Sequence, residues 1–98
     1  MKSITTTELA ALADARIIDV REDDEFASGH APGATNIPLS TFAEHFEEIP
    51  KDGTVYLICQ AGGRSARAGD YLESQGYDVV NVEGGTGDWI AQGLPVER

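Results

Sequence analysis

A β-favouring run at residues 54–58 ends directly before Cys59, the only cysteine of the chain. Its last four residues are Val, Tyr, Leu and Ile, with no polar residue between them. An uninterrupted apolar strand is typical of the centre of a parallel sheet, where helices cover both faces. Parallel strands also need long crossover connections, which are usually helices. This segment therefore predicts that strands and helices alternate along the chain.

The rest of the sequence supplies that alternation. Two further strands are predicted at 16–20 and 78–82, with an extended segment at 35–38. Five helices are predicted from capping and stop signals. The first helix begins at the capping-box pair Thr5 and Glu8, and the second covers 22–28 and ends at Gly29. The third begins at Ser40 or Thr41 and ends at Pro50. The fourth extends from about Arg64 to Gln75, before Gly76, and the fifth is a short helix that contains Trp89 and ends at Gly93. We expect one α/β domain over residues 1–98, with a mostly parallel central sheet and helices on both faces.

The composition and net charge of the chain limit the classes of molecule that it is expected to bind. The chain is 41% hydrophobic, as in ordinary globular proteins, and its formal net charge is −10. Such an acidic surface repels nucleic acid and anionic lipid, so we expect neither as a partner. An anionic small-molecule substrate would need a local positive site, because the overall field opposes it.

A lone cysteine excludes an intramolecular disulfide and argues against a cysteine-based metal cluster. The two histidines, His30 and His45, lack the spacing of metal ligands, so we expect no metal and no cofactor. A free thiol suits a reducing compartment, and no apolar stretch is typical of a signal peptide or membrane span. We therefore expect a cytoplasmic protein.

The segment after the central strand combines three features that favour a thiolate at Cys59. Gly62 and Gly63 permit backbone conformations in which successive N–H groups converge on one point. The start of the following helix adds partial positive charge and unpaired donors. Arg64 adds a permanent charge with a planar set of donors. Together these features predict a lowered pKa for the Cys59 thiol.

A structural role is the alternative interpretation for any free cysteine, because a free cysteine is often a small buried apolar residue at the end of a strand. The two glycines and the arginine that follow Cys59 favour the interpretation that Cys59 is a reactive thiolate. No His, Asp or Glu lies within the loop. The segment therefore does not indicate a Cys-His hydrolase, in which a base takes the thiol proton. Activation by electrostatics alone suits attack on sulfur, which needs little proton transfer.

Three segments together resemble the single-domain rhodanese-like family over nearly the whole chain. They are Asp19-Val20-Arg21 with Glu25-Phe26, Gly29-His30, Gly33-Ala34 and Asn36-Ile37-Pro38; then Cys59-Gln60-Ala61-Gly62-Gly63-Arg64-Ser65; and finally Gly84-Gly85, Trp89 and Gly93-Leu94-Pro95. The resemblance implies a sulfurtransferase. Cys59 would take the outer sulfur of a donor such as thiosulfate, release sulfite, and pass the sulfur from a persulfide to cyanide or a thiol.

The resemblance also implies the roles of the loop residues. Cys59 would be catalytic, Arg64 would hold an oxyanion donor, and the substrate-binding positions would be Gln60, Ala61, Gly62, Gly63, Arg64 and Ser65. Position 60 is neutral, whereas some thiosulfate-using relatives carry a charge there, so the donor preference is open. A sulfur-relay module that takes persulfide from a partner protein is the main alternative.

A phosphatase or arsenate reductase is the less favoured alternative. Four residues separate Cys59 from Arg64, whereas those relatives have five intervening residues around a phosphate-sized cradle.

Several residues outside the loop are expected to support it. The spacing of Arg21 and Glu25 predicts an ion pair on a short helix. Asp19 is expected to have an architectural role, with hydrogen bonds to loop N–H groups as the alternative. His30 is expected in a structural turn and Trp89 in the core, while His45 is expected to be exposed. Arg67 has two open roles, one at the site entrance and one in a surface ion pair.

Overall fold

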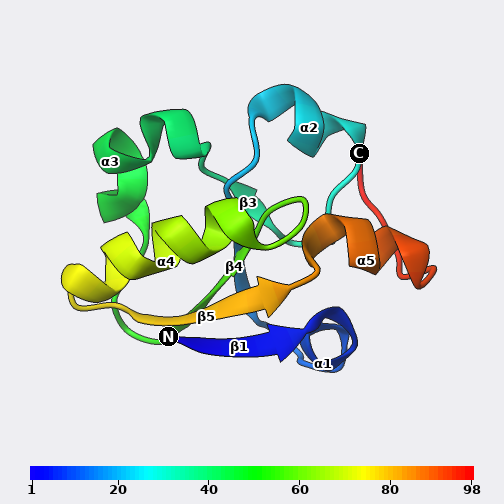
Figure 1. The fold of residues 1–98 in the computed structure, drawn as a ribbon, viewed down its shortest axis with the longest axis horizontal. Helices are drawn as coiled ribbons and strands as arrows, with labels where there is room; N and C mark the ends of the chain where they lie inside the picture. Colours follow the sequence, from blue (N-terminus) through cyan, green and yellow to red (C-terminus); the bar gives the residue numbers. More distant parts are fainter.

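The computed structural model describes all 98 residues and contains one five-stranded sheet in which every pairing is parallel (Figure 1). The strand order is β1-β5-β4-β2-β3, so β4 is the central strand, as the apolar run predicts. The strands are β1 (Lys2–Thr5), β2 (Arg16–Asp19), β3 (Thr35–Asn36), β4 (Thr54–Ile58) and β5 (Asp78–Glu83). The helices are α1 (Thr6–Ala10), α2 (Asp23–Ser28), α3 (Phe42–His45), α4 (Gly63–Ser74) and α5 (Gly85–Ala91).

The sheet separates two hydrophobic cores, which confirms the expected helices on both faces. One core joins α3 and α4 to the sheet and includes Leu57, Cys59 and Leu72. The other joins α1 and α5 to the opposite face and includes Ile58 and Trp89. Neighbouring residues of one strand point to opposite faces, so Leu57 and Ile58 enter different cores although both are completely buried.

Local signals account for several element boundaries. At the start of α1, the Thr5 hydroxyl accepts the N–H of Glu8 at 3.1 Å, and the Glu8 carboxylate accepts the N–H of Thr5 at 2.9 Å. This reciprocal pair is the predicted capping box. Gly29 ends α2, and Gly76 follows the C-terminal end of α4 with a φ of +90°, a conformation that glycine adopts without strain.

Two expectations about the elements were wrong. β1 was not predicted, because its residues are mostly polar and exposed; it forms by pairing with β5 along one side only. The expected helix from Ser40 or Thr41 to Pro50 is broken into α3 and two 3-10 turns, Leu39–Thr41 and Phe46–Glu48. Neither expected residue caps it: Thr41 makes no capping bond, and the Ser40 hydroxyl donates to Glu22 instead.

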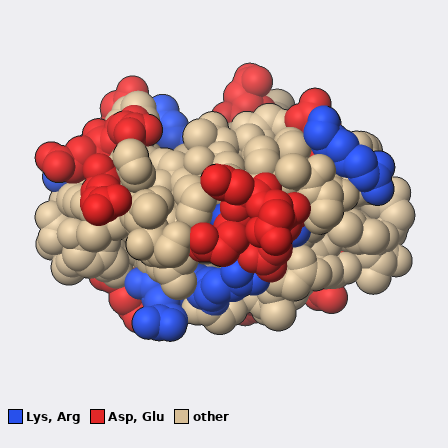
Figure 2. Space-filling model, turned by 90° about the horizontal axis from the view of Figure 1, so that it is seen from above, with Lys and Arg blue, Asp and Glu red and all other residues tan.

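The carboxyl ends of the parallel strands meet at one edge of the sheet, which brings Asp19, Cys59 and Glu83 to the same side. In the view of Figure 2, acidic side chains gather near the middle of the visible face, with Lys and Arg side chains beside them. The first turn of α2 contributes Asp23, Asp24 and Glu25 to the acidic residues. No helix has the length and apolar character that crossing a bilayer requires.

Candidate active site

Cys59 follows the last residue of β4, and its Sγ atom accepts two hydrogen bonds from the loop and the helix that follow. The N–H of Gly62 donates at 3.1 Å, and the hydroxyl of Ser65 lies 3.3 Å away. Gly62 has a φ of +111°, which glycine adopts without strain and which turns the chain into α4. The loop therefore presents polar hydrogens to a single sulfur atom.

These contacts shift the acidity of the thiol. Burial raises the pKa of Cys59, because it disfavours the charged form. Hydrogen bonds from the Ser65 hydroxyl and from the N–H groups of Ser65, Gly62 and Ala61 act in the opposite direction and outweigh burial. The net result is a pKa below the usual value of a cysteine thiol, which favours the thiolate.

Ser65 connects Cys59 to Asn81 on β5. The Ser65 hydroxyl lies 2.6 Å from Oδ1 of Asn81, and the Asn81 amide donates to the carbonyl of Gly62 at 3.2 Å. Both side chains are buried, so these polar groups depend on each other for hydrogen bonds. Asn81 therefore contacts both Gly62 and Ser65, the two residues that donate to Sγ.

The start of α5 fixes the backbone of the same loop. The N–H of Thr86 donates to the carbonyl of Cys59 at 2.8 Å, and the N–H of Gly87 donates to the carbonyl of Gln60 at 3.0 Å. Gly85 packs so closely that a Cβ atom there would lie 2.4 Å from the carbonyl oxygen of Cys59. Glycine is required at position 85 because any side chain would push α5 away from the loop.

The ion pairs near the loop differ from the expected one. Arg21 pairs with Asp19 rather than with Glu25, at 2.9 Å between Nη2 and Oδ2, and both side chains are almost completely buried. Glu25 pairs instead with Arg64, through two hydrogen bonds of 2.7 and 2.9 Å. The expectation was wrong because it considered only neighbours on one helix, whereas Arg64 lies in the first turn of α4, distant in sequence. Asp19 likewise receives its side-chain bonds from Arg21 and none from the loop.

The Arg64 pair also changes the acidity of Glu25. Its hydrogen bond to Arg64 lowers the pKa of Glu25 from 4.5 to about 2. Arg64 therefore faces a carboxylate that stays ionised throughout the neutral and mildly acidic range. This pair ties α2 to the loop and occupies the guanidinium group that the resemblance assigns to an oxyanion donor.

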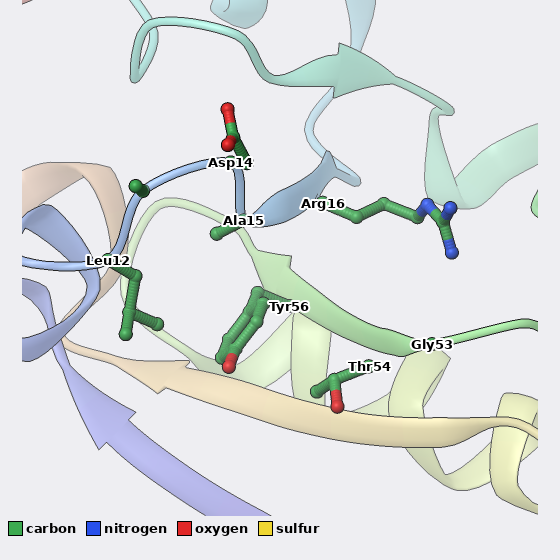
Figure 3. A pocket seen from close by; sticks show the side chains of 8 residues that line it. Leu12, Asp14, Ala15, Arg16, Gly53, Thr54 and Tyr56 are labelled. Atoms are coloured by element: carbon green, nitrogen blue, oxygen red, sulfur yellow. The ribbon is translucent and has the colours of Figure 1, made fainter.

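Cys59 itself is only 1% exposed, so its Sγ atom is not open to solvent in the folded chain. The surface pockets of the structure are lined by none of residues 59–65. The pocket in Figure 3, of about 300 Å³, lies where β2 and β4 begin and is lined by Arg16, Thr54 and Tyr56 among others. It is therefore at the opposite edge of the sheet from Cys59. Burial alone would suit a structural cysteine, but the donors on Sγ are not needed for packing.

The remaining marked residues lie around the site rather than in it. His30 donates a hydrogen bond from Nδ1 to the carbonyl of Phe26 at 2.8 Å, and its ring stacks on the Phe26 ring. Trp89 is 4% exposed in the core on the sheet face opposite to that of Cys59. His45 is exposed and contacts Glu48. Arg67 forms no ion pair and borders a pocket with Phe42, outside the Cys59 loop.

Sequence reasoning missed Asn81 and the start of α5 as parts of the site. The signal for Asn81 is a polar residue within an apolar strand, between Val80 and Val82. A buried amide in such a strand needs partners, and here the Cys59 loop provides them. The Gly84-Gly85 pair was noted, but its close approach to Cys59 depends on the packing of strands distant in sequence.

Comparisons with known proteins agree with this architecture. The family model described as "Rhodanese-like domain" matches residues 5–92. A sulfurtransferase of Allochromatium vinosum is 39% identical over 90% of this chain and 83% of that protein. The uncharacterized protein YqhL of Bacillus subtilis is 44% identical over 91% of this chain and 72% of that protein.

A solved structure gives the same result for the fold. The crystal structure of a rhodanese-related protein from Thermoplasma volcanium matches with a TM-score of 0.94 and 36% identity, covering 99% of this chain and 98% of that one. The relatives support sulfur transfer as the general class of chemistry. From its family model, its sulfurtransferase relative and its fold, the chain belongs to the rhodanese-like family.

Proposed function

We propose that this protein is a sulfurtransferase that carries sulfane sulfur as a persulfide on Cys59. The observation that carries the proposal is the pair of hydrogen bonds to Sγ from Gly62 and Ser65 at the end of the central strand. In a Cys59 persulfide the negative charge lies on the outer sulfur, where the N–H groups of the same loop would stabilise it. The loop would thus stabilise both the thiolate and the persulfide form of Cys59.

In the first half-reaction, the Cys59 thiolate attacks the outer sulfur of a donor such as thiosulfate or another persulfide. The new S–S bond forms on Sγ as the donor's own S–S bond breaks. Sulfite, or the donor's thiolate, leaves with the electron pair of the broken bond. No external oxidant or reductant is needed, because sulfur is exchanged between nucleophiles.

In the second half-reaction, a thiol or cyanide attacks the outer sulfur of the Cys59 persulfide. The acceptor takes that sulfur, and Cys59 leaves as a thiolate. A lowered pKa makes Cys59 a better leaving group, since the leaving thiolate is stabilised by the same hydrogen bonds. Such chemistry needs a free thiol, so we place it in a reducing compartment such as the cytoplasm.

The donor must reach an atom that the folded chain covers. Gln60, Ala61 and Gly63 are the exposed positions of the loop, and movement there would open a path to Sγ. Their backbone groups and the hydroxyl of Ser65 would then bind the transferred sulfur. An oxyanion donor would have to compete with Glu25 for the charge of Arg64.

The experiment is a donor panel followed by intact-mass measurement of the whole protein. Thiosulfate, glutathione persulfide and inorganic polysulfide are each added, and we expect one extra sulfur atom per chain with at least one donor. Because Cys59 is the only cysteine, Cys59→Ser should abolish the adduct completely. Absence of an adduct with every donor, from a folded wild-type protein, contradicts the proposal.

A second function is supported by the burial of Cys59 and by the lack of a pocket at its loop. In this version, a partner protein opens the loop on docking and delivers the sulfur from its own persulfide. Sulfur transfer from a persulfide-loaded cysteine desulfurase, compared with thiosulfate at equal concentration, separates the two functions. Loading by the protein donor alone supports the relay, and equal loading by thiosulfate supports the free enzyme.

A further inference from the structure

The positive charges near Cys59 are already matched by carboxylates. Nη1 of Arg64 donates to Oε1 of Glu25 at 2.7 Å, and Nη2 donates to Oε2 at 2.9 Å. Each terminal nitrogen of the guanidinium therefore donates to the same carboxylate in a bidentate pair, and this carboxylate neutralises the charge of Arg64. This is the strongest geometry that an arginine has for an anion, and a donor oxyanion would have to compete with it.

The second arginine near the loop is committed in the same way. Arg21 directs Nε and Nη2 to the carboxylate of Asp19, and Nη2 also donates to the carbonyl of Gly29 at 2.8 Å. Its remaining terminal nitrogen, Nη1, donates to Oε1 of Gln60 at 3.3 Å. Arg21 is 2% exposed, so it offers no free donors to a molecule arriving from solvent.

The surroundings add negative charge to these neutralised pairs. Asp23 and Asp24 lie with Glu25 in the first turn of α2, and Glu22 precedes them. Acidic side chains gather near the middle of the face seen in Figure 2. With a net charge of −10 on the whole chain, a dianion approaching the loop meets repulsion, and both Arg21 and Arg64 are already paired with carboxylates.

We propose that Glu25 is a positioning residue that selects sulfur donors by charge, favouring persulfides and singly charged donors over thiosulfate. This inference rests on the proposed function. Glu25 acts through Arg64: while it neutralises the guanidinium, a dianionic donor such as thiosulfate meets an ion pair instead of a free cation.

The balance of charge in the two reactions explains the preference. With thiosulfate, the thiolate attacks the outer sulfur and a sulfite dianion leaves, so charge builds on oxygens that need a cation. With a persulfide R–S–SH, the S–S bond breaks, the outer SH group joins Sγ, and R–S⁻ leaves with a single negative charge. Only the first reaction depends strongly on a free Arg64.

The test compares two donors of similar shape that differ by one charge, thiosulfate and methanethiosulfonate (CH₃SO₂S⁻). The rate of sulfur loading on Cys59 is measured by intact mass for the wild type and for Glu25→Gln. The glutamine keeps an oxygen that can accept the N–H of Glu22, as Glu25 does at 3.1 Å. Asp24→Asn is the matched control, because it removes the same charge from α2 at an exposed position without touching Arg64.

For the wild type, we expect methanethiosulfonate to load Cys59 at least about tenfold faster than thiosulfate. Glu25→Gln should raise the thiosulfate rate about tenfold relative to the methanethiosulfonate rate, and Asp24→Asn should change that ratio less than about twofold. A merely structural role for Glu25 would change both rates alike. Equal loading of the wild type by the two donors, or equal ratios in the two variants, overturns this inference. Loading by no donor at all overturns the proposed function as well.

Discussion

The hydroxyl oxygen of Ser65 lies 2.6 Å from Oδ1 of Asn81 and 3.3 Å from Sγ of Cys59. A hydroxyl has one hydrogen, so Ser65 cannot donate fully to both acceptors at once. While Cys59 is a neutral thiol, the shorter contact to Asn81 holds the hydrogen. A thiolate is the stronger acceptor, so ionisation of Cys59 favours rotation of the hydroxyl toward Sγ. The acidity of Cys59 is therefore linked to a residue of the neighbouring strand.

Removal of this hydroxyl should weaken the thiolate. Ser65→Ala takes away the largest single hydrogen-bond contribution to the lowered pKa of Cys59. We expect the pKa of Cys59 to rise and alkylation by iodoacetamide at neutral pH to slow about tenfold, as expected for loss of a hydrogen bond to a charged group. Ser28→Ala, an exposed serine on α2, is the control and should leave the rate unchanged. An unchanged rate in Ser65→Ala would show that Ser65 does not stabilise the thiolate.

Asn81 should stabilise the folded chain more than an apolar residue of similar shape would, although its neighbours Val80 and Val82 on β5 are apolar and buried. Asn81→Leu removes the 2.6 Å partner of the Ser65 hydroxyl and one donor to the Gly62 carbonyl, so that both groups keep only contacts of 3.2 to 3.3 Å. We expect the free energy of unfolding to fall by about 1–3 kcal/mol in urea titrations. In a Ser65→Ala background the same change should cost less, because the hydrogen bond between Ser65 and Asn81 is already absent. An increase in stability on Asn81→Leu would contradict this account.

The close contact between α5 and the loop predicts that alanine lowers the free energy of unfolding much more at Gly85 than at Gly93. Gly85→Ala places a methyl group against the carbonyl of Cys59, at a φ of +57°. We expect a loss of more than about 3 kcal/mol in the free energy of unfolding, together with slower sulfur loading. Gly93→Ala is the control, since its φ is +73° but no atom lies within 4 Å of the added carbon. Its cost should be about 1 kcal/mol, which isolates the backbone strain. Equal losses in the two variants would show that the contact has no effect.

The Glu25–Arg64 pair predicts a pH dependence of stability. The pKa of Glu25 is lowered from 4.5 to about 2, so its contribution to stability is fully present above pH 4.5 and is lost as the pH falls through about 2. Since both side chains are 34% exposed, we expect a contribution of only about 1 kcal/mol. Urea titrations of wild type and Glu25→Gln should differ by this amount at pH 6 and converge near pH 2. A difference that disappears already at pH 4 would indicate a Glu25 with ordinary acidity.

Much of the fold was predictable because its signals are local. The apolar run at Thr54–Ile58, the Thr5 and Glu8 capping box, and Gly29 at the end of α2 each act on nearby residues. β1 was missed because its stability comes from pairing with β5, far along the chain. The helix expected up to Pro50 was wrong because packing of Phe42 and Phe46 into the core is compatible with short, irregular turns.

The same distinction applies to the site. The glycines, the helix start and the position of Cys59 follow from sequence, because they adjoin one another. The partners of Arg21 and Arg64, and the bridge from Asn81 to Ser65, join segments that only the folded sheet brings together. Spacing along one helix favoured Arg21 with Glu25, but longer-range partners with better geometry were available to both.

We expect Cys59 to be a thiolate in the folded chain, and we expect movement of the exposed loop positions to let small reagents reach it. The direct measurement is the rate of iodoacetamide alkylation of native protein as a function of pH, followed by intact mass. We expect a single modified site whose rate rises with a midpoint clearly below about 8.5, the value of an unperturbed thiol. A midpoint at or above that value, or no alkylation until the protein is unfolded, would contradict the account.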